Sequence, residues 1–154
     1  MLGYKALDDN LINRYGFQYE VGKTYYLDGD LKWMKNGFHF CTRPEDTLRY
    51  VNGCCDYKIV EVRGYGDLIK YDDEQYDFYD MYVSSIMDII RIIPREELFD
   101  MIINTYDDRV KRFIILSELN EEEKKIIINK YPNLEFYINY YQNKEHVLKR
   151  KLDI

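Results

Sequence analysis

The sequence predicts an α+β fold with a mainly antiparallel sheet, a short helix after a strand at Phe38–Cys41, and a helical segment at the C-terminal end. Two observations predict it. In the first two thirds of the chain, apolar and polar residues alternate between turn dipeptides such as Asp28-Gly29, which is typical of strands joined by hairpins. After Pro94, apolar residues recur three and four positions apart, which is the period of an amphipathic helix.

The sheet is expected to begin with a strand at residues 3–7. Residues 17–21 alternate apolar and polar side chains, and we expect them to form a hairpin with residues 24–27 across a turn at Gly22 and Lys23. Further strands are expected at residues 38–41, 57–63, 68–71, 76–83 and 86–93.

A capped helix is expected directly after the Phe38–Cys41 strand. Residues 42–45 (TRPE) have the pattern of a capping box, in which the Thr42 hydroxyl accepts a hydrogen bond from the Glu45 amide and the Glu45 carboxylate accepts one in return. Pro44 in the first turn costs no helical hydrogen bond. This segment therefore marks the joint between strand and helix.

Two later connections are predicted from composition. Gly64 and Gly66 are expected to form a tight connection between the strands at residues 57–63 and 68–71. The acidic residues from Asp72 onward are expected to form a solvated loop that leads into the strand at residues 76–83, because a calcium loop needs ligands at regular offsets and a glycine at its sharp turn. No metal is therefore expected.

The helical part is expected to consist of three or four short helices. The first is opened by Pro94, and Asn120 is expected to cap a later one. We expect residues 1–106 to form the β-rich α+β domain and residues 107–154 to form a helical extension packed on or beside it. No internal repeat of 20 to 50 residues is evident in the sequence, although helical pairs of this kind can resemble fragments of repeat arrays.

Charge and hydropathy exclude several classes of partner. The net charge of −6 argues against nucleic-acid binding, which needs excess Lys and Arg. The basic residues 144–151 (KEHVLKRK) are interpreted as a solvated helix end. No apolar run approaches the length of a membrane span and no signal peptide is recognisable, so we expect a cytoplasmic protein, in the host cytoplasm if the chain is viral.

The cysteines indicate a reducing compartment. They are Cys41, Cys54 and Cys55, and an odd number that includes an adjacent pair does not suit a disulfide framework. No CxxC spacing indicates zinc. Cys41 shares a strand face with His39, but two neighbours along one strand usually lack the geometry for nucleophilic catalysis.

His39 is the first candidate for acid–base chemistry because its pKa lies near neutrality and it sits between two phenylalanines of a strand. No nucleophile or orienting carboxylate stands at an informative spacing from it. Phosphate-binding glycine loops, zinc-protease helices and nucleophile elbows are also missing from the sequence. A conventional hydrolase, kinase or metalloenzyme is therefore not expected.

Several motifs in order carry a family resemblance. They are GYKAL (3–7), GFQYEVGKTYY (16–26), NGFHFCTRPEDTLRYV (36–51), YKIVEVRGYGDLI (57–69) and YVSSIMDIIRII (82–93). Together they resemble a domain of unknown function in phage and bacterial proteins, a related form of which precedes the ankyrin repeats of giant-virus proteins. The resemblance covers about residues 1–106 and implies a fold and a viral setting. That family carries no established activity.

Residues 37–62 also resemble, more distantly, the core of ADP-ribosyltransferases. That likeness implies an NAD-binding cleft near His39, with Tyr4 or Lys5 at the first-strand position. The chain departs from the pattern because its first strand lacks the usual His or Arg. It also has no late Glu in a recognisable motif, and the nearest acids are Glu61 and Glu74.

The favoured hypothesis is a non-catalytic protein-interaction or assembly module of viral type, acting through a protein partner or self-association and without a cofactor. The alternative is an ADP-ribosyltransferase-like enzyme, or an NAD-binding pseudo-enzyme, with a cleft near His39. Aromatic anchors dominate interface energies, so exposed rings are the candidate contacts. The candidates are Tyr25, Tyr26, Trp33, Tyr137, Tyr140 and Tyr141.

Overall fold

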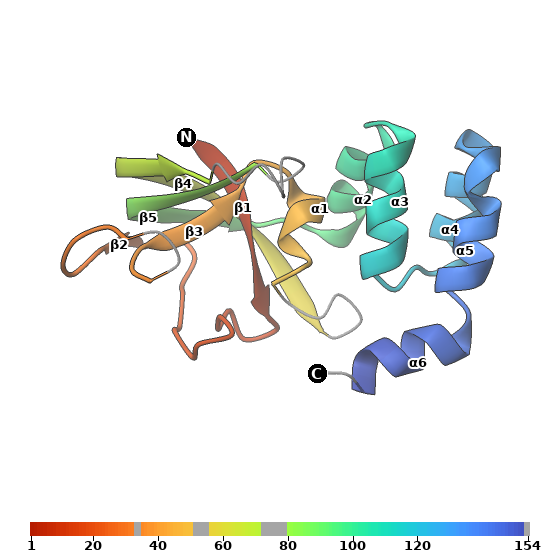
Figure 1. The fold of residues 1–154 in the computed structure, drawn as a ribbon, viewed down its shortest axis with the longest axis horizontal. Helices are drawn as coiled ribbons and strands as arrows, with labels where there is room; N and C mark the ends of the chain where they lie inside the picture. Colours follow the sequence, from red (N-terminus) through yellow and green to blue (C-terminus); the bar gives the residue numbers. More distant parts are fainter. Residues whose placement is uncertain (33–34, 51–55, 72–79, 153–154) are drawn as a thin grey trace.

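The computed structural model describes residues 1–32, 35–50, 56–71 and 80–152. It confirms the α+β class, with the strands gathered in one half of the molecule and the helices in the other (Figure 1). The strands are β1 (Leu2–Asp8), β2 (Thr24–Tyr26), β3 (Phe38–Cys41), β4 (Tyr57–Lys70) and β5 (Met81–Ile92). The helices are α1 (Pro44–Thr47), α2 (Arg95–Ile103), α3 (Asp107–Leu116), α4 (Glu121–Lys130), the 3-10 helix η2 (Pro132–Leu134), α5 (Glu135–Tyr141) and α6 (Lys144–Leu152).

The antiparallel sheet closes on itself. β1 lies between β3 and β4, while β5 pairs with β4 from Tyr82 to Ile92 and, on its other edge, with β3 at Met81–Ser84. This ring leaves few unpaired strand edges. Inside it lies one apolar cluster, the barrel core: Leu7, Tyr19, Phe38, Phe40, Val60, Val62, Met87 and Ile89.

The expected hairpin between residues 17–21 and 24–27 is wrong. Residues 17–21 form no strand, and β2 pairs with β5 instead, with Tyr25 opposite Met87. The reason is burial: Tyr19 is 3% exposed at the barrel core, while its alternating neighbour Phe17 stays 44% exposed. The alternation in this segment therefore reflects an irregular cover over the barrel core.

The predicted break at Gly64 and Gly66 is also wrong, because both glycines lie inside the continuous strand β4. A Cβ added at Gly64 would lie 2.3 Å from Cε1 of Phe40, so glycine makes room for that ring in the barrel core. Gly66 has a φ of +77° and lies at a register shift between β4 and β5, as expected of a bulge.

One further strand prediction is corrected. The two separate strands expected at residues 76–83 and 86–93 are one strand, β5, within the described residues, and residues 76–79 lie outside them.

A second apolar cluster, the helical core, joins the outer wall of the sheet to the helices. Ala6, Ile59 and Ile93 supply the sheet side. The helical side consists of Leu98, Phe99, Ile102, Ile103, Val110, Phe113, Ile114, Leu119, Ile127, Leu134 and Ile138, with Leu48 after α1. Helices on both sides of residue 106 thus share one core, and the division of the chain there stays a prediction.

The predicted capping box at residues 42–45 is wrong. Arg43 occupies the N-cap of α1 without a side-chain hydrogen bond to the helix. Both acids of α1 turn inward to α3 instead. The carboxylate of Asp46 accepts hydrogen bonds from Nη1 of Arg109, at 2.9 Å to each oxygen, and from Nη1 of Arg112. Glu45 Oε1 lies 3.6 Å from the same Arg109 nitrogen.

We expect Asp46→Asn to lower the free energy of unfolding by about 3–5 kcal/mol, because it removes the charge of the buried carboxylate to which two arginines donate. Asp46 is 0% exposed. Urea denaturation followed by circular dichroism measures the change. As a control, Asp108→Asn removes a carboxylate with a 75% exposed side chain, and its effect should stay within about 0.5 kcal/mol. Equal effects of the two variants would contradict the structural role assigned to Asp46.

Candidate functional site

The backbone of His39 is held by Lys5. β1 and β3 are in register at Tyr4 and Cys41, and the ammonium of Lys5 reaches across to donate to the His39 carbonyl oxygen at 2.7 Å. The Lys5 nitrogen also lies 5.6 Å from the centre of the Tyr19 ring. Burial lowers the pKa of Lys5 to about 8. The side chain of Lys5 therefore lies next to Tyr19 of the barrel core.

His39 is neutral at physiological pH. Burial lowers its pKa to about 4, and the positive charge of Lys5 acts in the same direction. A base with this pKa is poorly matched to proton transfer near pH 7. The buried thiol of Cys41, two residues on, has its pKa raised to about 12, mainly by burial and then by the charge of Asp46, which disfavours the reactive thiolate.

Tyr4 and Glu61 lie on the other side of the sheet wall from Lys5. They are opposite each other on β1 and β4, and Tyr4 packs against the helical core. Glu61 accepts a hydrogen bond from Arg91 at 2.7 Å, and Arg91 also binds Glu97 of α2. Lys5 therefore contacts the backbone of His39, while its own side chain lies on the side of the sheet wall opposite to Tyr4 and Glu61. Glu74 lies outside the described residues.

The predicted contact residues of the sheet differ in exposure. Tyr25 is half-buried, its ring 5.1 Å from that of Tyr19, and its hydroxyl accepts a hydrogen bond from the Glu20 amide. Tyr26 is 71% exposed. Trp33 lies outside the described residues.

The aromatic residues of α5 divide between two faces. Tyr137 and Tyr141 are half-buried, stack on each other at 6.3 Å and pack against the helical core. Tyr140 is 48% exposed, and its ring stacks at 6.3 Å on that of Phe136, which is 71% exposed. We call Phe136 and Tyr140 the aromatic face. Sequence reasoning missed Phe136, although its spacing of four from Tyr140, away from buried Ile138, indicates a separate helical face.

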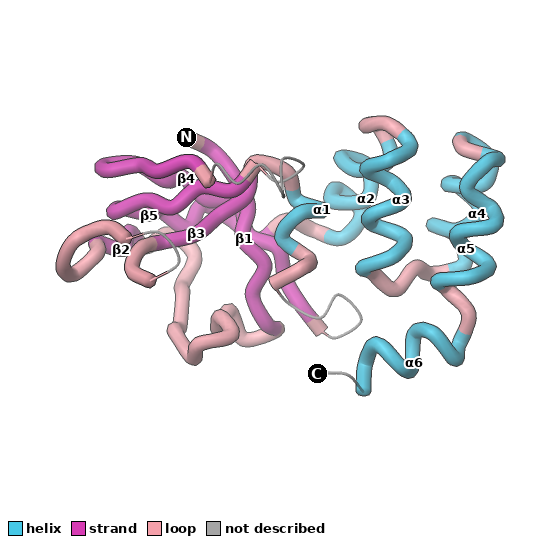
Figure 2. Tube along the Cα trace, in the orientation of Figure 1, coloured by secondary structure: helices cyan, strands magenta, loops and turns pink. Residues whose placement is uncertain are grey.

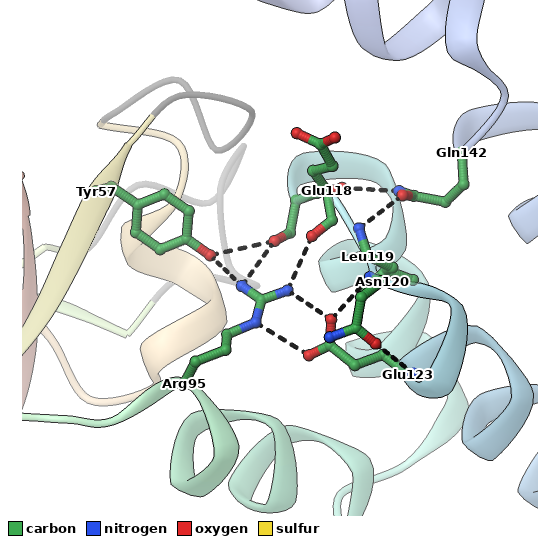
Figure 3. A network of polar contacts seen from close by, with 8 residues as sticks. Tyr57, Arg95, Glu118, Leu119, Asn120, Glu123 and Gln142 are labelled. Atoms are coloured by element: carbon green, nitrogen blue, oxygen red, sulfur yellow. Dashed lines mark hydrogen bonds and ion pairs between the residues drawn. The ribbon is translucent and has the colours of Figure 1, made fainter.

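A polar network around Arg95 positions the helices that carry this face (Figure 3). The guanidinium donates to both carboxylate oxygens of Glu123 in α4, at 3.0 and 3.1 Å. It also donates to the Tyr57 hydroxyl at 2.7 Å, to the Ser117 hydroxyl at 3.2 Å and to the Glu118 carbonyl at 2.9 Å. Arg95 thus links the start of β4, the end of α3 and the first turn of α4.

Two further contacts complete the network. The predicted cap at Asn120 is confirmed: its side chain accepts from the Glu123 amide, and Glu123 accepts in return from the Asn120 amide. At the end of α5, the buried amide of Gln142 donates to the Ser117 carbonyl and accepts from the Leu119 amide (Figure 3). It also donates to the Ile114 carbonyl. α5 is therefore anchored to the connection between α3 and α4.

The described ranges contain neither a metal-binding cluster nor a helix that could span a membrane. Nowhere in them do three or more His, Cys, Asp or Glu side chains gather in a way that could hold a metal ion. In the same part of the chain, no helix has the length and apolar character needed to cross a membrane.

Comparison with known proteins adds one finding. A family model described as "Domain of unknown function (DUF7666)" matches residues 1–101, from β1 into α2. No curated protein matches the chain, and no solved structure does. The match is consistent with an uncharacterised family, and it lends no support to the giant-virus ankyrin or ADP-ribosyltransferase likenesses.

We expect His39 to make folding stability depend on pH. Its pKa is about 4 in the folded chain and near 6.5 unfolded, so the unfolded chain binds more protons between these values. Stability should therefore fall as pH decreases from 6.5 to 4, by up to about 3 kcal/mol. His39→Gln should remove this component, whereas His146→Gln should retain it. Urea midpoints measured across this range that change equally in the wild type and His39→Gln would contradict the assignment.

Proposed function

We propose a function for this chain from its own surface, because it belongs to the DUF7666 family of domains of unknown function and the description of that family gives no activity. We propose a non-catalytic protein-interaction or assembly module whose contact surface is the aromatic face of α5. The single observation that carries the proposal is the exposure of two stacked rings, Phe136 and Tyr140, on a firmly anchored helix. The proposal includes a viral setting and a location in the host cytoplasm. Both rest on the family resemblance of the sequence.

The energetics favour binding at this face. Large aromatic side chains are enriched at interfaces and supply much of their binding energy. Beneath the exposed rings, Leu134 and Ile138 are 0% and 3% exposed, and Gln142 ties the end of α5 to α3. A rigid support of this kind lowers the entropy that a partner's binding must overcome. The face is therefore preorganised for a protein contact.

The transferase alternative has less support. Lys5 lies on the other side of the sheet wall from Tyr4 and Glu61, and Glu61 is bound by Arg91. The pKa of His39 does not suit a general base at neutral pH. NAD is therefore a cofactor only in the ADP-ribosyltransferase-like alternative, and the proposed interaction module needs none.

We expect Phe136→Ala with Tyr140→Ala to weaken capture of partner proteins from cells of the source organism by about 30-fold, which corresponds to about 2 kcal/mol of anchor energy. Quantitative mass spectrometry of affinity-purified chain measures the loss, and thermal unfolding checks that the variant is folded. Tyr15→Ala is the matched control, because Tyr15 is 78% exposed elsewhere on the surface. Unchanged capture by the double variant would contradict the proposal.

We expect millimolar NAD to leave the melting temperature of the chain unchanged. A ligand present at about 100 times its dissociation constant would stabilise the fold by about 2.7 kcal/mol, which a thermal-shift assay resolves easily. A stabilisation that disappears in His39→Gln would support the enzyme alternative instead.

A further inference from the structure

The helical segment contains an internal repeat. The pentapeptide IINTY at residues 102–106 recurs as IINKY at residues 127–131, twenty-five positions later. This finding corrects the expectation that the chain has no repeat of 20 to 50 residues. The repeat is hard to see in the sequence because few other paired residues are identical, and only some pairs, such as Phe113 and Ile138, share burial.

The structure repeats with the same spacing. Moving α3 (Asp107–Leu116) by twenty-five positions gives residues 132–141, which are η2 followed by α5. Buried Ile102 and Phe113 have the buried counterparts Ile127 and Ile138. We call α2 with α3 the first hairpin and α4 with η2 and α5 the second hairpin. They stand side by side in Figure 2.

The second hairpin packs on one face of the first. The Tyr131 hydroxyl donates to the Ile103 carbonyl at 3.0 Å, and the Lys130 ammonium donates to the Asn104 side chain at 2.8 Å. On the other helix of each hairpin, the ammonium of Lys111 lies 5.0 Å from the centre of the Tyr137 ring. This face of the first hairpin is therefore a stacking surface for another hairpin.

The repeat identifies the equivalent surface of the second hairpin. Phe136 is the counterpart of Lys111, whose side chain is 27% exposed beneath Tyr137, and Phe136 itself is 71% exposed. Tyr140 is the counterpart of half-buried Ile115 and is 48% exposed. The aromatic face thus occupies the position that receives the next hairpin in the stack, and nothing in the second hairpin itself covers it.

α6 does not fill this position. It follows the second hairpin as the first helix of a third unit would, with the Asn143 side chain accepting from the His146 amide at 2.9 Å. In Figure 1, however, α6 lies across the ends of the hairpins and does not run alongside α4 and α5. His146 contacts the Tyr140 ring at 4.5 Å and leaves Phe136 exposed.

A second copy of this chain cannot supply the next hairpin in the same mode. That mode requires the face through which the second hairpin packs on the first, with residues such as Tyr131 and Tyr137. In each copy this face is already covered by the first hairpin. The corresponding side of the first hairpin is covered by the sheet wall, where Leu98 and Ile102 share a core with Ile59.

Resting on the proposed function, we propose that the aromatic face binds a helical hairpin of a different protein, which continues the stack by one unit. The partner hairpin would present aliphatic and aromatic side chains spaced like Leu134, Tyr137 and Ile138. These are the residues with which the second hairpin packs into the helical core. Stacks of helical pairs in which each unit contacts only its neighbours are the general plan of helical repeat proteins.

A synthetic peptide of residues 117–143, the second hairpin with its caps, is the probe. Titrated into the full chain, the fluorescently labelled peptide should bind saturably and gain helical circular dichroism. Phe136→Glu with Tyr140→Glu in the full chain should weaken binding at least tenfold, and Tyr15→Glu should leave it unchanged. A control peptide with Tyr137→Glu and Ile138→Glu should not bind.

Two results would overturn the inference. One is no binding of the peptide up to about 1 mM, or equal binding to the aromatic-face variant. The other is a dimer of the full chain, seen by light scattering, that the aromatic-face variant abolishes, because the occupant would then be a second copy. Partner capture that depends on Phe136 and Tyr140 would still support the proposed function in either case, so the two proposals fail separately.

Discussion

The guanidinium of Arg95 is the contact on which the arrangement of the helices depends. It carries several donors in one rigid plane, and it uses them on Tyr57 of β4, Ser117 and Glu118 after α3, and Glu123 of α4. Apolar packing alone is non-directional and would allow the second hairpin to slide over the first. A planar group bound from three elements at once sets their relative position. The exposure of the aromatic face follows from that position.

The closed sheet gives the helices a wall to pack on. β4 pairs with β1 on one side and with β5 on the other, so the sheet has an inside, filled by the barrel core, and an outside. The apolar side chains of Ala6, Ile59 and Ile93 lie on the outside, where contact with water would be unfavourable. The first hairpin covers them. Asp46 adds a charged contact between α1 and α3. The chain thus has one half in which the sheet encloses the barrel core. In the other, helical half, the aromatic face of the second hairpin is exposed to solvent.

Local signals predicted the elements whose structure depends on near neighbours. The strand at Phe38–Cys41, the helix following Pro94 and the cap at Asn120 all appear where alternation, proline and capping chemistry place them. The failures involve distant partners. Tyr19 belongs to the barrel core and not to a hairpin, and Gly64 makes room for Phe40. Glu45 and Asp46 are buried by contacts to α3, although acids in a first turn usually remain in water.

The sequence by itself determined the α+β class, the order of most elements, and Tyr140 as a candidate contact, because periodicity and capping act within a few residues. Only the tertiary structure decided which rings are exposed: it buried one side of Tyr137 and Tyr141 and left Phe136 open. It also placed Tyr4 and Glu61 on the other side of the sheet from Lys5, since adjacent residues of a strand point to opposite sides of a sheet. The repeat became visible only there, because burial is conferred by neighbouring hairpins, and the four residues shared by IINTY and IINKY are its main local trace.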